Sequence, residues 1–418
     1  MRTTLILLVA SLFADLVPQV PAANADRSGI LTNVQTVKES TIAGRKVVRY
    51  THPSLDLWNY EKPQCDYFCL VYPKTLATGK VPLRVILHSA GGGGELQMTS
   101  KLNKDPTNLV AGTDESSYGL YLDCLDNKAT DWWWGYRPTI QKSQDRYKNE
   151  LCPTEKRLLA TVDWVSRTFP IDSNQVYLSG ISMGGSGSLG LGMCHGDIFA
   201  AIAVIVPAGV EHVQFRMQNG QHPEPPPILN FSSQSDGWSR GQERLIADCQ
   251  TNHYSMVFAW GPYGHSDNAT VYHAAAYEFP WLSIRKNVAY PVFTNASTDD
   301  SYPGFMNLTA PQQKGQINAY FRWKNITDTA RSFVMELRLL KPGELHKPVD
   351  APARAIADVT LRRLQQFHVQ AGKTYKWQLT SGNLPFQSGQ IQADAAGLLT
   401  IPKVKITDTP IQLRIEFD

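Results

Sequence analysis

The sequence predicts two domains: an α/β domain with a doubly wound, mainly parallel sheet, followed by an all-β sandwich of immunoglobulin or fibronectin type. Up to about Lys286, apolar runs of strand length alternate with helical segments, which is typical of a parallel sheet covered on both faces. After Pro291 the strands become short and alternating, and turn signals separate them. A chain of 418 residues also exceeds what one hydrophobic core usually organises.

The first domain is predicted over residues 26–288. A helix is expected over 154–169, because Thr154 can cap its start ahead of Glu155 and apolar residues follow at helical spacing. In sheets of this kind, ligands bind beyond the carboxyl ends of the strands. The expected strands, several of them continuously apolar, are 67–72, 83–88, 119–124, 175–179, 200–206, 228–232 and 256–260.

The second domain is predicted over residues 289–418, with 291–315 as a linker or irregular edge. It contains no cysteine, and its residues form no constellation that suggests catalysis. Its expected strands are 316–323, 332–340, 357–361, 365–369, 374–379, 389–393, 398–401 and 412–417.

The first 25 residues have the pattern of a secretory signal peptide. An apolar segment over 5–17 follows Arg2, and the small residues Ala23, Asn24 and Ala25 suit cleavage near Ala25. We therefore expect a secreted or periplasmic protein. The formal net charge of only +3, without runs of lysine or arginine, argues against partners such as nucleic acid or a membrane surface.

All six cysteines lie before residue 250, and an even number in an exported protein favours disulfides. The expected pairs are Cys124 with Cys152, Cys194 with Cys249 and Cys65 with Cys69, although the sequence does not fix the connectivity. A zinc site at Cys65 and Cys69 is disfavoured, because no second pair has the necessary spacing. No metal site is expected.

The stretch Gly180-Ile181-Ser182-Met183-Gly184 directly follows the expected strand 175–179. A strand that ends in G-x-S-x-G and turns at once into a helix holds its serine on a tight corner with an exposed hydroxyl. Side chains at the two glycines would crowd the approach of strand and helix. Ser182 is therefore the candidate nucleophile.

A serine nucleophile needs a histidine base, and the histidine needs a carboxylate that fixes its tautomer. Asp236 and His265 follow successive expected strands after Ser182, in the order acid and then base. Asp267 is a reserve acid, but it would have to fold back sharply onto His265. The rival histidines lie at the end of or beside helical segments: His195, His253 and His273.

An oxyanion hole needs backbone N–H groups that face the developing negative charge. Met183 should supply one, and the glycine-rich loop after His88 should supply the other. A phosphate-binding loop is the alternative for these glycines, but Glu95 stands where a lysine would be required.

The most unusual composition is an aromatic segment between the expected strand 119–124 and the expected helix. Flat aromatic faces stack on sugar rings or aromatic acyl groups, although tryptophans are also ordinary core residues. The candidate substrate-binding residues are Trp132, Trp133, Trp134 and Tyr136, with Trp238 beside the proposed acid.

These motifs together resemble the secreted α/β-hydrolase esterases, specifically the feruloyl and acetyl xylan esterases and the related polyhydroxybutyrate depolymerases. The resemblance covers about 47–286 and implies a triad of Ser182, Asp236 and His265, an acyl-enzyme intermediate and no cofactor. The sequence departs from the family at Ser89, because a glycine usually follows the histidine at this position. We expect Ala90 to supply the second N–H of the oxyanion hole. The motifs are Leu87-His88-Ser89-Ala90-Gly91, the serine elbow with Gly185, Phe199-Ala200-Ala201-Ile202-Ala203, Gln234-Ser235-Asp236 and Gly264-His265-Ser266.

The leading hypothesis is an exported serine carboxylesterase that removes feruloyl or acetyl groups from polysaccharide. A polyester depolymerase and a peptidase of the prolyl-oligopeptidase type are alternatives within the hydrolases. From another class, a non-catalytic polysaccharide-binding protein would also suit a sandwich domain, but the complete set of serine, acid and histidine weighs against it.

Overall fold

The computed structural model describes residues 28–60, 65–75, 78–105, 107–124, 132–136, 147–148, 150–219, 224–266, 273–306, 309 and 311–417. The predicted signal peptide and Asp267 lie outside these residues. None of the helices within them combines the length and the hydropathy that a membrane crossing requires.

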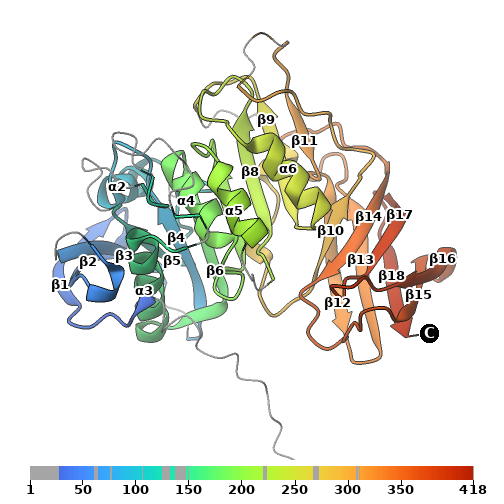
Figure 1. Ribbon diagram of the computed structural model, residues 1–418, viewed down its shortest axis with the longest axis horizontal. Coiled ribbons are helices and arrows are strands. Elements are labelled where there is room, and N and C mark those ends of the chain that lie inside the picture. Colours follow the sequence, from blue (N-terminus) through green and yellow to red (C-terminus); the bar gives the residue numbers. More distant parts are fainter. Residues whose placement is uncertain are drawn as a thin grey trace, which may run out of the picture.

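The N-terminal half is built on a large mixed sheet (Figure 1) of ten strands. Six neighbouring strands, from β5 through β4 and β6 to β9, run parallel, and β1 to β3 extend one edge with antiparallel pairing. This is an α/β-hydrolase-like sheet. In spatial order the strands are β1 (Gln35–Ile42), β2 (Arg45–Pro53), β3 (Cys65–Val71), β5 (Tyr118–Leu122), β4 (Val81–Leu87), β6 (Ile171–Ile181), β7 (Ala201–Ile205), β8 (Ile228–Ser233), β9 (Met256–Gly261) and β11 (Gly315–Ile317).

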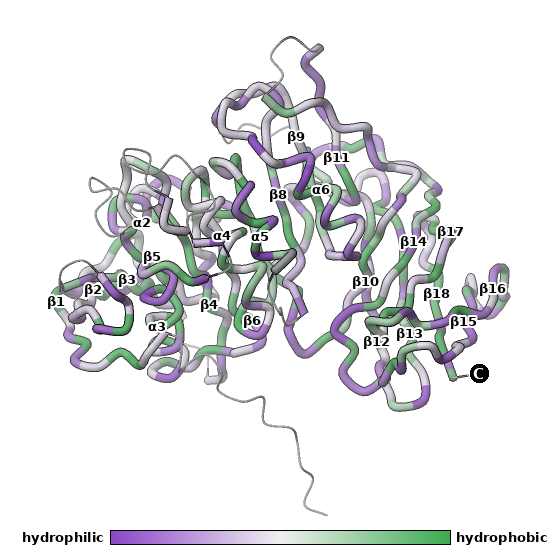
Figure 2. Tube along the Cα trace, in the orientation of Figure 1, coloured by the Kyte–Doolittle hydropathy of each residue, from purple (hydrophilic) through white to green (hydrophobic). Residues whose placement is uncertain are grey.

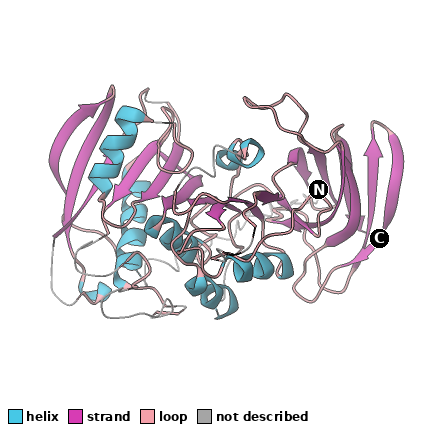
Figure 3. Cartoon of the chain, turned by 90° about the horizontal axis from the view of Figure 1, so that it is seen from above, coloured by secondary structure: helices cyan, strands magenta, loops and turns pink. Residues whose placement is uncertain are grey.

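The helices gather around this sheet and leave the opposite end of the molecule to strands and loops (Figure 3). Helix α3 begins at Pro153, because Cys152 caps it and the Glu155 carboxylate accepts the Cys152 N–H. The predicted cap at Thr154 was therefore wrong by two positions. The main helices are α2 (Gly94–Lys104), α3 (Pro153–Thr168), α4 (Met183–Gly192), α5 (Glu211–Asn219) and α6 (Gln242–Thr251), with the short α8 (Ala274–Tyr277), η1 (Asp56–Trp58) and η2 (Trp281–Ser283).

The C-terminal half contains two antiparallel sheets that share one apolar core. Hydrophobic segments run through the interior of both halves of the chain (Figure 2). The expected strand 365–369 does not form, and this segment follows β14 as an irregular connection. The three-stranded sheet has the order β10 (Tyr290–Thr294), β14 (Arg354–Arg362), β17 (Thr400–Thr407), and the five-stranded sheet has the order β12 (Phe321–Asp328), β13 (Ser332–Leu339), β18 (Ile411–Phe417), β15 (Thr374–Ser381), β16 (Leu384–Gln392).

The chain returns to the first sheet after β10, which the predicted boundary at residue 288 does not anticipate. Strand β11 pairs antiparallel with β9, so residues of the predicted linker and second domain complete the N-terminal sheet. Just after β11, the Asn318 amide donates hydrogen bonds to the Met256 and Phe293 carbonyls, each at 3.0 Å. The two halves are thus joined by backbone pairing and buried hydrogen bonds, in addition to the chain itself.

Arginine side chains from the C-terminal half reinforce this junction. The guanidinium of Arg363 donates to the carbonyls of Phe199 and Ala200, which precede β7. Arg362 donates to the carbonyls of Asn252 and His253 after α6. Each guanidinium thus makes charge-assisted hydrogen bonds from the C-terminal half to the N-terminal half.

We predict that Asp299, beside this junction, makes stability depend on pH. Burial raises the pKa of its carboxyl from 3.8 to about 7, against the opposing hydrogen bond from the Asn318 N–H. The folded protein therefore holds this proton where the unfolded chain has lost it, so the contribution of Asp299 to stability falls as pH rises from about 4 to about 7. Asp299→Asn should flatten the dependence of Tm on pH in this window, whereas Asp163→Asn, at a half-exposed carboxylate on α3 that pairs with Arg167, should not. Equal slopes for wild type and Asp299→Asn would contradict the prediction.

The predicted disulfides are not formed. Cys65, Cys69, Cys152, Cys194 and Cys249 carry free thiols. Cys65 and Cys69 lie on one strand, four residues and therefore about 13 Å apart, which is too far for a disulfide. The Cys152 thiol instead donates to the Trp133 carbonyl.

Candidate active site

Ser182 lies on a strained corner between β6 and α4. Its backbone has φ 58° and ψ −119°, a conformation that side-chain-bearing residues rarely adopt outside functional sites. A Cβ at Gly180 would lie 2.3 Å from the Gly184 backbone, and one at Gly184 would lie 2.1 Å from the Leu87 carbonyl oxygen. Only glycine at both positions allows β4, β6 and α4 to approach this closely.

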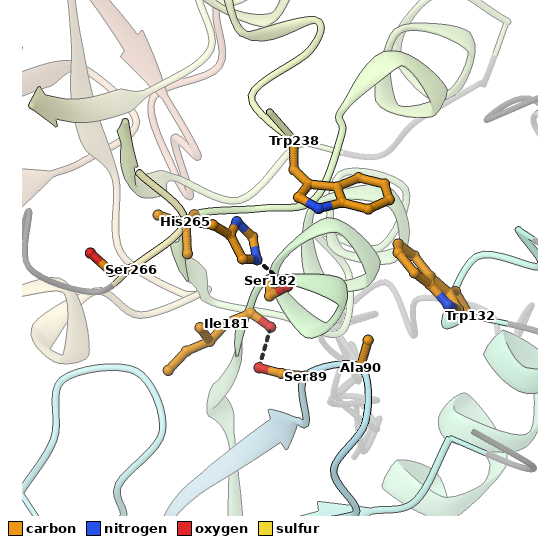
Figure 4. Close-up of a pocket in the computed structure, with 9 residues that line it drawn as sticks. Ser89, Ala90, Trp132, Ile181, Ser182, Trp238, His265 and Ser266 are labelled. Carbon is orange, nitrogen blue, oxygen red and sulfur yellow. Dashed lines mark hydrogen bonds between the residues drawn. The ribbon is translucent and has the colours of Figure 1, made fainter. Parts of the chain in front are cut away.

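Three side chains predicted from the sequence meet in a hydrogen-bonded row. Ser182 Oγ lies 2.7 Å from His265 Nε2 (Figure 4), and His265 Nδ1 lies 2.8 Å from Asp236 Oδ2. Because the carboxylate accepts the Nδ1 proton, Nε2 presents its lone pair to the serine hydroxyl. This geometry suits proton transfer from Ser182 to His265 with Asp236 as the orienting acid.

The turn after β8 holds Asp236 in place. Its carboxylate is buried, and Oδ1 accepts the backbone N–H of Trp238 at 2.8 Å. Ser239 Oγ donates to the Asp236 carbonyl, and Ser235 Oγ accepts the Gly264 N–H next to His265. These bonds fix both the acid and the histidine loop, so little reorganisation is needed for reaction.

The rival histidines make other contacts. His273 Nε2 lies 2.6 Å from the Trp260 carbonyl oxygen, and burial lowers the pKa of this imidazole. His195 is buried and lies beside Asp197. His253 lies near Arg362, and its pKa is lowered chiefly by burial. The imidazole hydrogen-bonded to Ser182 is that of His265.

The two predicted oxyanion donors flank the serine. Met183 is the first residue of α4, and its N–H is one of the four that a helix leaves without an intrahelical acceptor. Ala90 lies on the loop after β4 and lines the same pocket as Ser182 (Figure 4). Ser89 anchors this loop, because its hydroxyl donates to the Ile181 carbonyl at 3.0 Å.

A pocket of about 470 Å³ surrounds Ser182 and has one aromatic side. Trp132 and Trp238 lie on that side with ring centroids 5.5 Å apart, and Ile181 and Ser266 lie on the other side of the serine (Figure 4). Val206 also lines the pocket at the end of β7, with a φ of 40° that is unusual for a β-branched residue. In the sequence, Ser89, Ile181 and Ser266 were named only as parts of motifs. Neither they nor Val206 were assigned to the substrate pocket, although all four follow or end a strand of the first sheet.

The other predicted substrate-binding aromatics are core residues. Trp133 and Trp134 are 1% and 2% exposed, and Tyr136 is 7% exposed. The ring of Trp134 stacks on that of His212 with a centroid distance of 4.6 Å, so its faces are occupied by protein. The structure therefore places these three aromatics in the interior, whereas Trp132 at the start of the same segment lines the pocket.

Comparison with known proteins gives a family match over part of the chain. Residues 133–301, less than half of the chain, match the family model Esterase, described as "Putative esterase". No curated protein matches the sequence. The match and the arrangement around Ser182 define the class of enzyme: the protein is a carboxylic ester hydrolase.

Several solved structures share parts of the fold. An S-formylglutathione hydrolase from Agrobacterium tumefaciens has 12% identity and a TM-score of 0.40, covering 56% of this chain and 92% of its own. FphF, a fluorophosphonate-binding serine hydrolase from Staphylococcus aureus, has 12% identity and a TM-score of 0.38, with coverages of 56% and 98%. A ferulic acid esterase from Anaeromyces mucronatus has 14% identity and a TM-score of 0.39, with coverages of 56% and 87%. At these values the similarities say nothing about the substrate of this protein.

Proposed function

We propose that the protein is an exported carboxylesterase that uses Ser182 as nucleophile, His265 as general base and acid, and Asp236 as the orienting carboxylate. The observation that carries this proposal is the continuous row of hydrogen bonds from Ser182 through His265 to the buried Asp236, inside a pocket open to solvent. The apolar segment 5–17 motivates export.

In the proposed reaction, Ser182 Oγ attacks the ester carbonyl carbon while its proton passes to His265 Nε2. The carbonyl oxygen becomes an oxyanion that accepts hydrogen bonds from the Met183 and Ala90 N–H groups. His265 then gives the proton to the departing alcohol, which leaves an acyl group on Ser182. Water, deprotonated by His265, then attacks the acyl carbon, and His265 returns the proton to Ser182 Oγ as the carboxylic acid leaves.

Feruloyl or acetyl esters of polysaccharide are the proposed substrates. Two tryptophans, Trp132 and Trp238, line the pocket beside Ser182 and offer a surface for a phenyl or sugar ring. Aromatic contacts of this kind contribute about 0.5–1.5 kcal/mol beyond the area that they bury. Such a surface favours a feruloyl group or a sugar ring over an acetyl group as the part of the substrate that it contacts.

The test compares ferulate and acetate release from arabinoxylan and from small esters by wild-type enzyme and by variants of the tryptophan pair. Trp238→Leu keeps the backbone N–H that holds Asp236, and it should lower kcat/KM for a feruloyl ester by roughly tenfold. Acetyl ester hydrolysis should change much less.

Trp164→Leu is the matched control, because Trp164 lies on α3 and packs against Tyr50 and Phe68 away from the pocket. It should lower Tm without changing the ratio of feruloyl to acetyl activity. An unchanged ratio in both Trp238→Leu and Trp132→Leu would contradict the role of the tryptophan pair. Absence of ferulate and acetate release by the wild-type enzyme would overturn the substrate proposal.

A further inference from the structure

His88 is a completely buried histidine directly before the loop that carries Ala90. Its Nδ1 lies 2.8 Å from the carbonyl oxygen of Ser89, the next residue. On the other side of the ring, the Cys124 backbone N–H donates to Nε2, also at 2.8 Å. The proposed chemistry at Ser182 uses neither contact.

These two contacts fix the tautomer of His88. Because Cys124 N is a donor, Nε2 must offer its lone pair, and the ring proton must therefore lie on Nδ1. Nδ1–H then donates to the Ser89 carbonyl. Asp123 Oδ1 lies 3.5 Å from Nε2, outside the range of a short hydrogen bond, so it does not displace the Cys124 donor.

The Ser89 carbonyl and the Ala90 N–H belong to the same peptide group. A trans peptide is planar, and its C=O and N–H point in opposite directions. A side chain that fixes the direction of the Ser89 oxygen therefore also fixes the direction of the Ala90 hydrogen. The Gly92 N–H donates to the same oxygen at 3.2 Å and supports the same orientation.

The preceding peptide group is held as well. Trp133 Nε1–H donates to the His88 carbonyl oxygen at 3.0 Å, and its ring packs edge-on against the imidazole. A Cβ at Gly187 of α4 would lie 2.2 Å from the Trp133 Cβ, so this tryptophan packs closely against the helix that directly follows Ser182. The loop and the nucleophile helix are thus fixed relative to each other.

We propose that His88 is a positioning residue for the oxyanion hole: its Nδ1–H fixes the Ser89–Ala90 peptide so that the Ala90 N–H faces the reacting carbonyl oxygen. Trp133, which the sequence suggested as a substrate contact, instead braces the neighbouring peptide. This inference rests on the proposed function, since an oxyanion forms only if Ser182 attacks an ester.

Two conservative substitutions separate the two hydrogen bonds of His88. The side-chain amide of His88→Asn can replace the Nδ1–H donor to Ser89 but cannot reach Cys124. His88→Gln can keep an acceptor for Cys124 but has no donor at the Nδ1 position. His88→Gln should therefore lower kcat by about 100-fold with little change in KM, the loss typical of one oxyanion donor, while His88→Asn should stay within about tenfold of wild type.

The Ki of a trifluoromethyl ketone inhibitor is a second measurement, and a loss of stability alone would not change it. Its adduct with the serine places an oxyanion in the hole, so its Ki should rise in His88→Gln by the same factor by which kcat/KM falls. His212→Gln is the matched control, because His212 is also buried and contacts the Ser186 carbonyl. It should lower Tm and leave kcat and Ki unchanged.

Three results would overturn the proposal: normal kcat in His88→Gln, equal losses in the two His88 variants, or an unchanged Ki where kcat falls. A different result would show that the proposed function itself is wrong. Ser182→Ala would then keep its esterase activity, and a fluorophosphonate would label another residue, whatever the kinetics of the His88 variants.

Discussion

Ser182→Ala should reduce kcat for ester hydrolysis by roughly 10⁴-fold to 10⁶-fold, as expected when a triad nucleophile is removed. The variant should fold, because the side-chain contact of Ser182 is with His265 at the solvent-open pocket. Alanine also carries the same Cβ in the strained backbone conformation of this corner. Hydrolysis of a small chromogenic ester and labelling by a fluorophosphonate both measure the loss.

Ser188→Ala is the control for this prediction. Ser188 lies on α4, the helix that directly follows Ser182. It is buried and donates its hydroxyl to the Gly184 carbonyl at 2.8 Å. Its removal should cost about 1 kcal/mol of stability and leave turnover and labelling intact. Substantial activity in Ser182→Ala, or labelling that persists in it, would show that another residue is the nucleophile.

The central strands could be predicted because they are buried on both faces and therefore read as continuous apolar runs. The hairpin of β1 and β2 was missed for the converse reason: nearly all side chains of β1 are exposed, so its sequence carries little hydrophobic signal. Strand β11 could not be assigned to the first sheet, because its three residues join β9 through a long-range pairing that no local pattern encodes.

The same distinction applies to the site. The positions of Ser182, Asp236 and His265 follow from strand ends, which a parallel sheet brings to one edge. The roles of Trp132 and Trp133 depend instead on which way each side chain turns from an irregular segment. Local sequence does not determine that direction, and the structure places the Trp132 ring at the pocket and the Trp133 ring against the His88 carbonyl, where the loop after β4 begins.

The C-terminal half, according to these contacts, completes the catalytic fold. A chain that ends at residue 288 lacks β11, and the edge of β9 is left unpaired. It also loses buried side chains from the cores of the first domain: Phe305, Ile317, Ala319 and Leu340. Burial of a large apolar side chain contributes roughly 1.5–3 kcal/mol, so the combined loss approaches the total stability of an ordinary domain, about 5–15 kcal/mol.

We therefore expect the chain truncated after residue 288 to aggregate or to lack cooperative unfolding and activity on small esters, as measured by soluble yield, thermal melting and esterase assay. In the full chain, Asn318→Ala should lower the free energy of unfolding by about 1–3 kcal/mol more than Asn325→Ala does. Both asparagines have positive φ, 61° and 52°, so the two variants share the backbone strain. Only Asn318 bonds across the junction, to Met256 and Phe293, whereas the exposed Asn325 bonds to the half-buried Glu336 side chain. A soluble, cooperatively folded and active truncated chain would instead make the C-terminal half a dispensable module.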